Sequence, residues 1–223
     1  MSWTKRAAPA MGDDNPLDVF DSDWVRVYGA GRIIVRGGAV NRLEGESLAI
    51  TDYRYTGDGA PTGDQLIRMR IHTGTSAEEH FQPMVRVDAS GNGYLATWRP
   101  VSNFVRLFRF VAGGVNSILT TTNVTLSINT TYEVSLKITG TNPCIITASD
   151  DVNGELISYE DSHASRYTSG YPGILWNAAG NVKGSASPAW VDDIDIENWA
   201  TGTGVSVLSE DLTQFEWSKL SPP

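Results

Sequence analysis

The sequence predicts an all-β protein, built as a two-sheet antiparallel jelly-roll sandwich with an arm at each end. Apolar and polar residues alternate along several short segments, which is the pattern of strands with one buried face. Turn signals rich in glycine separate these segments, and no long stretch has the spacing of an amphipathic helix. These observations exclude a mainly helical protein and indicate about a dozen strands.

The expected strands follow one another with short turns between them. They cover residues 32–35, 47–55, 65–72, 83–88, 94–99, 104–111, 115–121, 132–139, 144–149, 155–159, 173–176 and 191–198. Residues 65–72 and 132–139 alternate cleanly, whereas residues 32–35 form an apolar, β-branched run. The glycine-rich sequences at 90–93 and 113–114 are hairpin signals, so antiparallel neighbours are expected at both turns.

Three regions are expected along the chain. Residues 1–16 show no periodic pattern and form an N-terminal arm, residues 17–199 form the jelly roll, and residues 200–223 form a C-terminal docking tail. The tail begins with a glycine-rich hinge and continues with apolar residues too frequent for a free linker. We therefore expect the tail to pack on its own domain or on a neighbouring subunit.

Composition narrows the classes of partner. The net charge of −9 argues against nucleic acid, and no run approaches the ~20 apolar residues of a membrane span, so neither partner is expected. Residues 1–11 lack the apolar centre of a secretory signal, so we expect no such signal. Cys144 is the single cysteine and has apolar neighbours, which predicts a buried, inert thiol.

The last expected strand carries three carboxylates on one face, namely Asp193, Asp195 and Glu197. Successive members of such a row lie roughly 6.6 Å apart along a strand. Paired carboxylates serve retaining glycosidases as nucleophile and acid/base. The alternative is structural, with this strand closing the sandwich and with Ile194 and Ile196 in the core.

A family resemblance is carried by three groups of residues: the hairpin formed by 93–98 and 105–110, the strand 132–138, and the segment 170–175 placed before 191–194. On these residues the chain from Asp18 to Trp199 resembles the concanavalin A-like lectin/glucanase jelly rolls, particularly laminin-G-like domains of phage and bacterial proteins. The resemblance implies a fold, and it implies an activity far less directly.

Laminarinase-like members of that superfamily carry Glu-x-Asp-x-x-Glu or Glu-x-Asp-x-Glu on a mid-chain strand. In this chain Asp193 stands where the leading Glu would be, ahead of Asp195 and Glu197. The shorter side chain would set the nucleophile back by roughly 1 Å or more, a misplacement that can lower a rate ~100-fold. The strand also lies late in the domain, so we expect no catalytic residues and no enzyme.

The same resemblance implies that one carboxylate of the closing strand caps a turn or helps to hold calcium on the convex side. Calcium prefers several hard oxygen ligands, including carboxylates and backbone carbonyls. The candidate metal ligands are Asp21, Asp23, Asp192 and Asp193. No cofactor is required by the sequence, and bound Ca²⁺ is left open.

Glycan binding is a further candidate activity. Lectin sites pair an aromatic platform with planar polar groups that hydrogen-bond sugar hydroxyls. The candidate ligand-binding residues are Tyr94, Trp98, Arg99, Arg68, Arg70, Arg86, Tyr171 and Trp176. The same residues fit a bland interpretation, with the tryptophans in the core and the arginines on a solvated strand face.

These observations lead to three hypotheses about function, ranked from the most to the least favoured. The first is a non-enzymatic virion or surface-assembly protein, such as a phage decoration, head-fibre or tail component, whose residues 1–16 and 200–223 bind partner subunits and whose lectin-like domain contacts host glycans. The alternative is a carbohydrate-binding module or adhesin domain outside the cell or at its surface. The third is a glycoside hydrolase that uses the carboxylates of residues 191–198. A homo-oligomer is left open.

Overall fold

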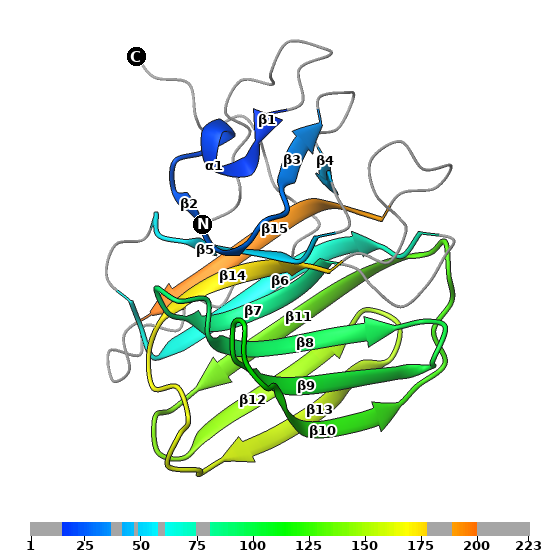
Figure 1. Cartoon of the computed structure of the whole chain (residues 1–223). Helices are drawn as coiled ribbons and strands as arrows, with labels where there is room; N and C mark the ends of the chain where they lie inside the picture. The colour runs from blue at the N-terminus through cyan, green and yellow to red at the C-terminus, as the bar shows by residue number, and fades with distance from the viewer. Residues whose placement is uncertain are drawn as a thin grey trace, which may run out of the picture.

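Two antiparallel β-sheets pack face to face in the computed structural model, which describes residues 15–36, 42–46, 49–57, 61–74, 81–177 and 189–199 (Figure 1). Within these residues one sheet has eight strands, in the order β1 (Asn15–Pro16), β3 (Ile33–Arg36), β4 (Arg42–Gly45), β15 (Trp190–Trp199), β6 (Asp64–His72), β11 (Thr131–Thr139), β12 (Cys144–Asp150) and β13 (Gly154–Asp161). The other has seven, in the order β10 (Ser117–Asn123), β9 (Phe104–Phe110), β8 (Gly93–Arg99), β7 (Phe81–Val87), β14 (Tyr171–Trp176), β5 (Thr51–Tyr55) and β2 (Trp24–Gly29). One short helix, α1 (Leu17–Phe20), precedes β2. The predicted fold class, an all-β two-sheet antiparallel sandwich, is confirmed.

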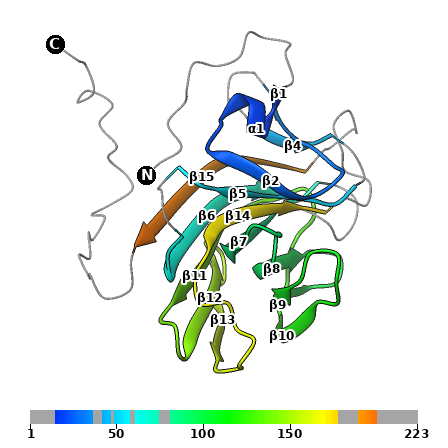
Figure 2. The same cartoon turned by 60° about the vertical axis from the view of Figure 1, so that its left-hand side comes forward.

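The core lies between the two sheets. Figure 2 shows them as separate layers, with β11, β12 and β13 of one sheet across from β8, β9 and β10 of the other. Strand β11 shows how the sequence produces this packing, because its burial alternates along its length. Tyr132, Val134, Leu136 and Ile138 are buried and join the same apolar cluster as residues of the opposite sheet.

Strand β15 completes the eight-stranded sheet by inserting between β4 and β6 rather than by extending an edge. Ile194 and Ile196 are buried in the inter-sheet core. A bulge between Val191 and Asp193 shifts the pairing with β6 by one residue, and the carboxylates follow it on the outer face. The interpretation of this segment as the closing strand, with both isoleucines inward, is confirmed.

A second, smaller apolar cluster lies on the outer face of the seven-stranded sheet. Val85 and Tyr94 face each other across β7 and β8 and belong to the inter-sheet core. Their neighbours therefore point the other way, because successive side chains of a strand alternate between faces. The outer cluster consists of Met84, Val87, Leu95, Phe110 and Leu175, with Val27 and Ile50 packed against it.

Some elements differ from the sequence-based expectations. Strand β2 was not expected, because it is an edge strand that is partly exposed on both faces and therefore lacks alternation. Asn15 and Pro16, the last residues of the expected arm, already pair with β3. Residues 1–14 and 200–223, which hold the rest of the arm and the whole tail, lie outside the described residues. No helix in the described ranges is long and apolar enough to cross a membrane.

Candidate functional site

The carboxylates of β15 face a row of arginines on the neighbouring strand β6. Nη1 of Arg68 donates to Oδ2 of Asp195 at 2.8 Å and to Oε1 of Glu197 at 2.7 Å. Nε of Arg70 lies 3.6 Å from Oδ2 of Asp193. The cross-strand register sets Asp195 opposite Arg68 and Asp193 opposite Arg70. Pairing across the strands therefore accounts for the carboxylate row, because each of the three carboxylates has an arginine beside it.

Arg68 and Arg70, two of the expected glycan-binding residues, form ion pairs in these same contacts. Both lie on the outer face of the eight-stranded sheet, and both are half-exposed and paired with carboxylates. At the end of this row the His72 ring stacks on Trp190, with centroids 4.8 Å apart and planes 8° from parallel. This face is a surface of paired charges, and it lies on the opposite side of the sandwich from the outer face of the seven-stranded sheet.

Arg86, a third expected glycan-binding residue, is a buried structural anchor. Its side chain is fully buried, and its backbone has a φ of 55°, in the left-handed region. Nε donates to the carbonyl of Gly63 at 2.6 Å, Nη1 donates to that of Tyr167 at 2.7 Å, and Nη2 donates to that of Gly140. The prediction that Arg86 binds a ligand is wrong, because its guanidinium is buried and donates hydrogen bonds to the backbone of three loops.

The expected aromatic platform is also wrong for three of its members. Tyr94, Trp98 and Trp176 are buried in the core between the sheets, where a sugar has no access. The Trp98 indole donates to Asp150 at 3.2 Å, so its polar atom is satisfied inside the protein. Cys144 is a free thiol 3.5 Å from the Tyr94 hydroxyl, and its predicted burial is confirmed.

Two of the four candidate calcium ligands, Asp21 and Asp193, have partners among the described residues. Oδ1 of Asp21 accepts the backbone N–H of Asp23 at 3.0 Å and so closes a turn before β2. Asp193 faces Arg70, and the side chain of Asp192 lies outside the described residues. Within the described ranges no three His, Cys, Asp or Glu side chains form a group that would hold a metal ion. The calcium expectation stays a prediction.

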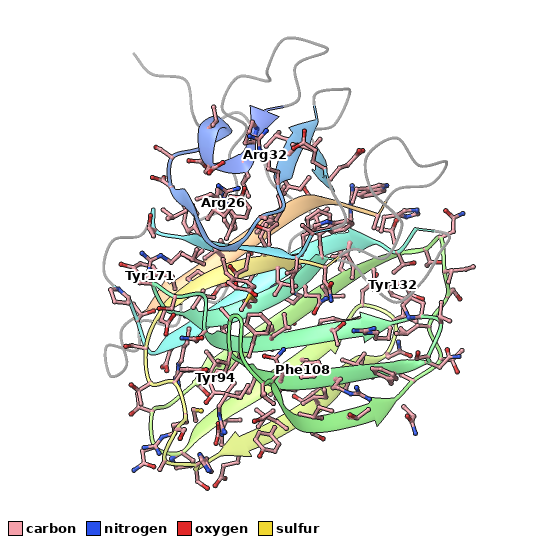
Figure 3. The ribbon with its side chains drawn as sticks, viewed as in Figure 1. Arg26, Arg32, Tyr94, Phe108, Tyr132 and Tyr171 are labelled. Carbon is pink, nitrogen blue, oxygen red and sulfur yellow. The ribbon has the colours of Figure 1, made fainter. Side chains whose placement is uncertain are left out.

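Strand β9 presents two aromatic rings and a guanidinium on the outer face of the seven-stranded sheet. Val105 and Leu107 are fully buried in the core, so alternation places Phe104, Arg106 and Phe108 on the opposite face. The Arg106 guanidinium carbon lies 4.2 Å from the centroid of Phe104 and 5.9 Å from that of Phe108. We call these three half-buried residues the β9 stripe; Figure 3 labels Phe108 on this strand.

Arg106 is held in place by contacts that leave its terminal nitrogens available. Its Nε donates to the Thr121 hydroxyl on β10 at 3.0 Å. Within the described part of the chain, neither terminal nitrogen has a hydrogen-bond partner or a carboxylate beside it. Arg99 and Asn123 lie on either side of Phe104 in the strand register. A guanidinium backed by an aromatic ring, beside a hydroxyl and an amide, can hydrogen-bond sugar hydroxyls or an anion.

A second arginine–aromatic pair lies at the other side of this face. The Arg54 guanidinium carbon is 5.1 Å from the ring centroid of Tyr171. Figure 3 labels Tyr171. A continuous register row runs from Arg54 through β14, β7 and β8 to Phe108, which is four strand spacings or roughly 19 Å. Of the expected glycan-binding residues, Arg99 and Tyr171 lie on this face.

Asp52 on β5 is a buried carboxylate near the same outer cluster. It is fully buried, and neither oxygen accepts a hydrogen bond of normal geometry from the described residues. The tip of the β7–β8 hairpin covers it, since a Cβ added to Gly91 would lie 2.7 Å from Oδ2. Burial is the main cause that raises the pKa of Asp52 to about 7; the nearby backbone N–H of Tyr28 opposes the rise, and the charge of Asp88 adds to it.

Sequence reasoning missed the β9 stripe, Arg54 and Asp52. The stripe does alternate with Val105 and Leu107, so a signal was present. Both sets are rich in apolar side chains, however, and the pattern alone does not say which set faces the core. Nothing local marks Asp52 for burial, because the hairpin that covers it lies far along the chain.

No protein-family model matches the chain, and no curated protein matches its sequence. Solved structures do match its fold. The carbohydrate-binding module CBM66 from Bacillus subtilis aligns with a TM-score of 0.58 and 19% identity, covering 79% of this chain and 96% of that one. A B. subtilis protein of unknown function with a galectin-like fold gives 0.55 and 12%, covering 90% and 100%. The exoplasmic/lumenal domain of VIP36, in a form with Ca²⁺ and Man3GlcNAc bound, gives 0.51 and 9%, covering 87% and 91%. The chain therefore shares the two-sheet, lectin-like sandwich fold of these structures.

Proposed function

We propose that this chain is a carbohydrate-binding domain that holds a glycan on the outer face of its seven-stranded sheet, at the β9 stripe. One observation carries the proposal: Arg106 is fixed between two phenylalanine rings on the surface, with terminal nitrogens that no described residue engages. Sugar sites combine an apolar surface with a few planar hydrogen-bonding groups, and the stripe supplies both.

The outer face of the eight-stranded sheet is a poorer candidate for the glycan site than the β9 stripe. There Arg68 and Arg70 are paired with the carboxylates of β15, so a ligand would have to replace existing ion pairs. On the β9 stripe a ligand replaces only water, because Arg106 has no carboxylate to release within the described residues. The lectin-type fold adds support of a weaker kind, since one fold hosts many functions.

The test is a glycan array probed with the labelled protein and with two variants. Phe108→Ala removes one ring of the stripe, and Ile145→Ala removes an exposed apolar side chain from β12 of the other sheet. We expect array signals that fall about tenfold or more in Phe108→Ala and persist in Ile145→Ala. Thermal unfolding of each variant shows whether the domain remains folded.

Two results would overturn the proposal. An array with no signal for the wild-type protein would remove the carbohydrate-binding function. Signals that persist at full strength in a folded Phe108→Ala protein would place the glycan away from the β9 stripe. We propose that the domain binds without cleaving, and a chromatographic search for shortened oligosaccharides after long incubation tests that part.

Assembly into a phage particle or other surface structure is a second proposal, and it rests on the sequence of residues 200–223. Phe215, Trp217 and Leu220 make this tail more apolar than a free linker. Deleting residues 201–223 from the full chain should release the protein from the particle fraction while leaving a folded glycan-binding domain. Continued sedimentation of the truncated protein with particles would contradict a docking role for the tail.

A further inference from the structure

Three neighbouring strands of this strongly acidic chain contain basic residues but no acidic ones. The net charge is −9, yet β8, β9 and β10 together contain three arginines and no aspartate or glutamate. The acidic residues gather elsewhere, and β15 alone carries four of them. The β9 stripe therefore lies at the centre of a region whose described strands supply no anion of their own.

The strand register separates the three arginines by face. Arg109 faces Tyr94 across β8 and points into the core, where its charge is matched by Asp161. Arg99 lies opposite Phe104, and Arg106 lies two residues beyond it on the same face. Arg99 and Arg106 are thus diagonal cross-strand neighbours, about 7–8 Å apart at their Cα atoms. Their side chains project from the sheet on the surface proposed to bind sugar.

Apart from Arg99, the residues next to Arg106 in the sheet are uncharged. Thr97 and Thr121 lie opposite it on the two flanking strands, and Phe104 and Phe108 lie beside it on its own strand. Coulomb attraction at the edge of an apolar surface is stronger than in open water, because the low dielectric of the rings screens it less. Arg68, Arg70 and Arg109 are each paired with a carboxylate of the protein. A ligand anion beside Arg106 would form the corresponding ion pair there.

We infer that the glycan bound at the β9 stripe is an acidic one, whose carboxylate or sulfate group is held by Arg106 with Arg99 beside it. This inference rests on the proposed carbohydrate-binding function and narrows its ligand class. A guanidinium presents two parallel N–H donors that match the paired oxygens of a carboxylate or sulfate. The phenylalanine rings then pack against the apolar face of the sugar that carries the group. A nucleic acid is disfavoured, because its many phosphates would meet a chain of net charge −9.

The experiment compares neutral, uronate-containing and sulfated glycans printed on one array, together with a single-stranded oligothymidylate, at low and high salt. Arg106→Gln removes the charge and keeps most of the stem, while Arg106→Lys keeps the charge without the planar fork. Arg70→Gln is the matched control, because it removes an arginine from the outer face of the other sheet. Thermal unfolding confirms that each variant is folded.

The expected result is binding confined to acidic glycans, weakened by salt, about tenfold to hundredfold weaker in Arg106→Gln, and unchanged in Arg70→Gln. Arg106→Lys should fall between the wild-type protein and Arg106→Gln. The uronate and sulfate spots distinguish the two sources of the anion. Binding to neutral glycans alone, or acidic binding that survives Arg106→Gln, would overturn the inference and leave the proposed function intact. Stronger binding to the oligothymidylate than to any glycan would overturn it in favour of phosphate, and an array with no glycan signal would remove both proposals.

Discussion

Arg109 on β9 and Asp161 at the end of β13 form a buried ion pair that joins the two sheets. Nη2 of Arg109 donates to both carboxylate oxygens, at 2.8 and 2.6 Å, and the carboxylate is only 1% exposed. The Tyr94 hydroxyl donates to the same carboxylate at 2.7 Å. Although burial opposes its charge, these two donors hold the pKa of Asp161 below its ordinary value. The pair therefore fixes the separation of the sheets at the end of the sandwich where β8, β9 and β13 meet.

Asp161→Asn should destabilise the fold by roughly 3 kcal/mol, because it leaves Arg109 buried without its counter-charge. Urea unfolding at neutral pH measures the loss. Glu160→Gln is the matched control, since Glu160 is the exposed neighbour on the same strand and should change stability by well under 1 kcal/mol. Equal effects of the two substitutions would show that the ion pair contributes no net stability.

The depressed pKa of Asp161 also gives its contribution a pH dependence. A carboxyl with a lowered folded-state pKa stabilises the protein above its unfolded value of 3.8, and this stability is lost as the pH falls through the folded value. The difference in unfolding free energy between the wild-type protein and Asp161→Asn should therefore be large at pH 6 and shrink toward pH 3, roughly in step with protonation. A difference that stays constant over this range would contradict the assignment.

Asp52 should act in the opposite direction. Its pKa rises from 3.8 to about 7 in the folded state, so its protonated form is favoured by folding. That contribution is complete below pH 3.8 and is lost as the pH rises to 7, at up to about 1.4 kcal/mol per unit. Asp52→Asn removes the titration, so the stability of the variant relative to the wild-type protein should grow from pH 4 to about pH 7 and level off above that.

Urea midpoints of the wild-type protein, Asp52→Asn and the exposed control Glu155→Gln, compared at several pH values, test this prediction. Only the Asp52 variant should change the slope of stability against pH between 4 and 7. If all three slopes coincide, Asp52 is not a buried carboxyl beneath the Gly91 hairpin.

The fold was predictable because most of its strands show a local alternation of apolar and polar residues. Strand β11 alternates so regularly that its buried residues follow from the sequence, and so do Ile67, Met69 and Ile71 of β6. Ile194 and Ile196 could likewise be placed inside, because the strand that holds them alternates and ends the periodic region. Strand β2 could not be found this way, since an edge strand exposed on both faces has no pattern to read.

The site was less predictable, because it depends on which strands become neighbours. Arg68 looked available in the sequence, and only the insertion of β15 beside β6 brings Asp195 and Glu197 to it. Trp98 looked like a platform, and only the pairing of sheets buries it. Arg106 could be recognised only after Val105 was known to face the core. Whether an arginine is paired with a carboxylate of the protein therefore depends on which strands become neighbours, and local composition does not reveal this.

Arg86 should tolerate no substitution that removes its donors. Arg86→Met keeps the length of the stem but leaves the carbonyls of Gly63, Gly140 and Tyr167 without their shared donor. We expect a loss of roughly 3–5 kcal/mol in unfolding free energy, because several buried hydrogen bonds disappear together. Arg54→Met, at a half-buried arginine that stacks on Tyr171, should cost much less and serves as the control. Similar midpoints for the two variants in urea would refute the anchoring role.

The carboxylate row of β15 supplies the last prediction. The double variant Asp195→Asn, Glu197→Gln removes both acceptors of Arg68, whose side chain is 37% exposed. Because solvent screens such pairs, the loss of stability should be about 1 kcal/mol or less. Glycan binding at the β9 stripe should be unchanged, since the row lies on the outer face of the other sheet. Calorimetric unfolding and the glycan array measure the two effects. Hydrolysis of any bound oligosaccharide by the wild-type protein, abolished in this variant, would instead restore the glycosidase interpretation and show that Arg68 releases the carboxylates when substrate binds.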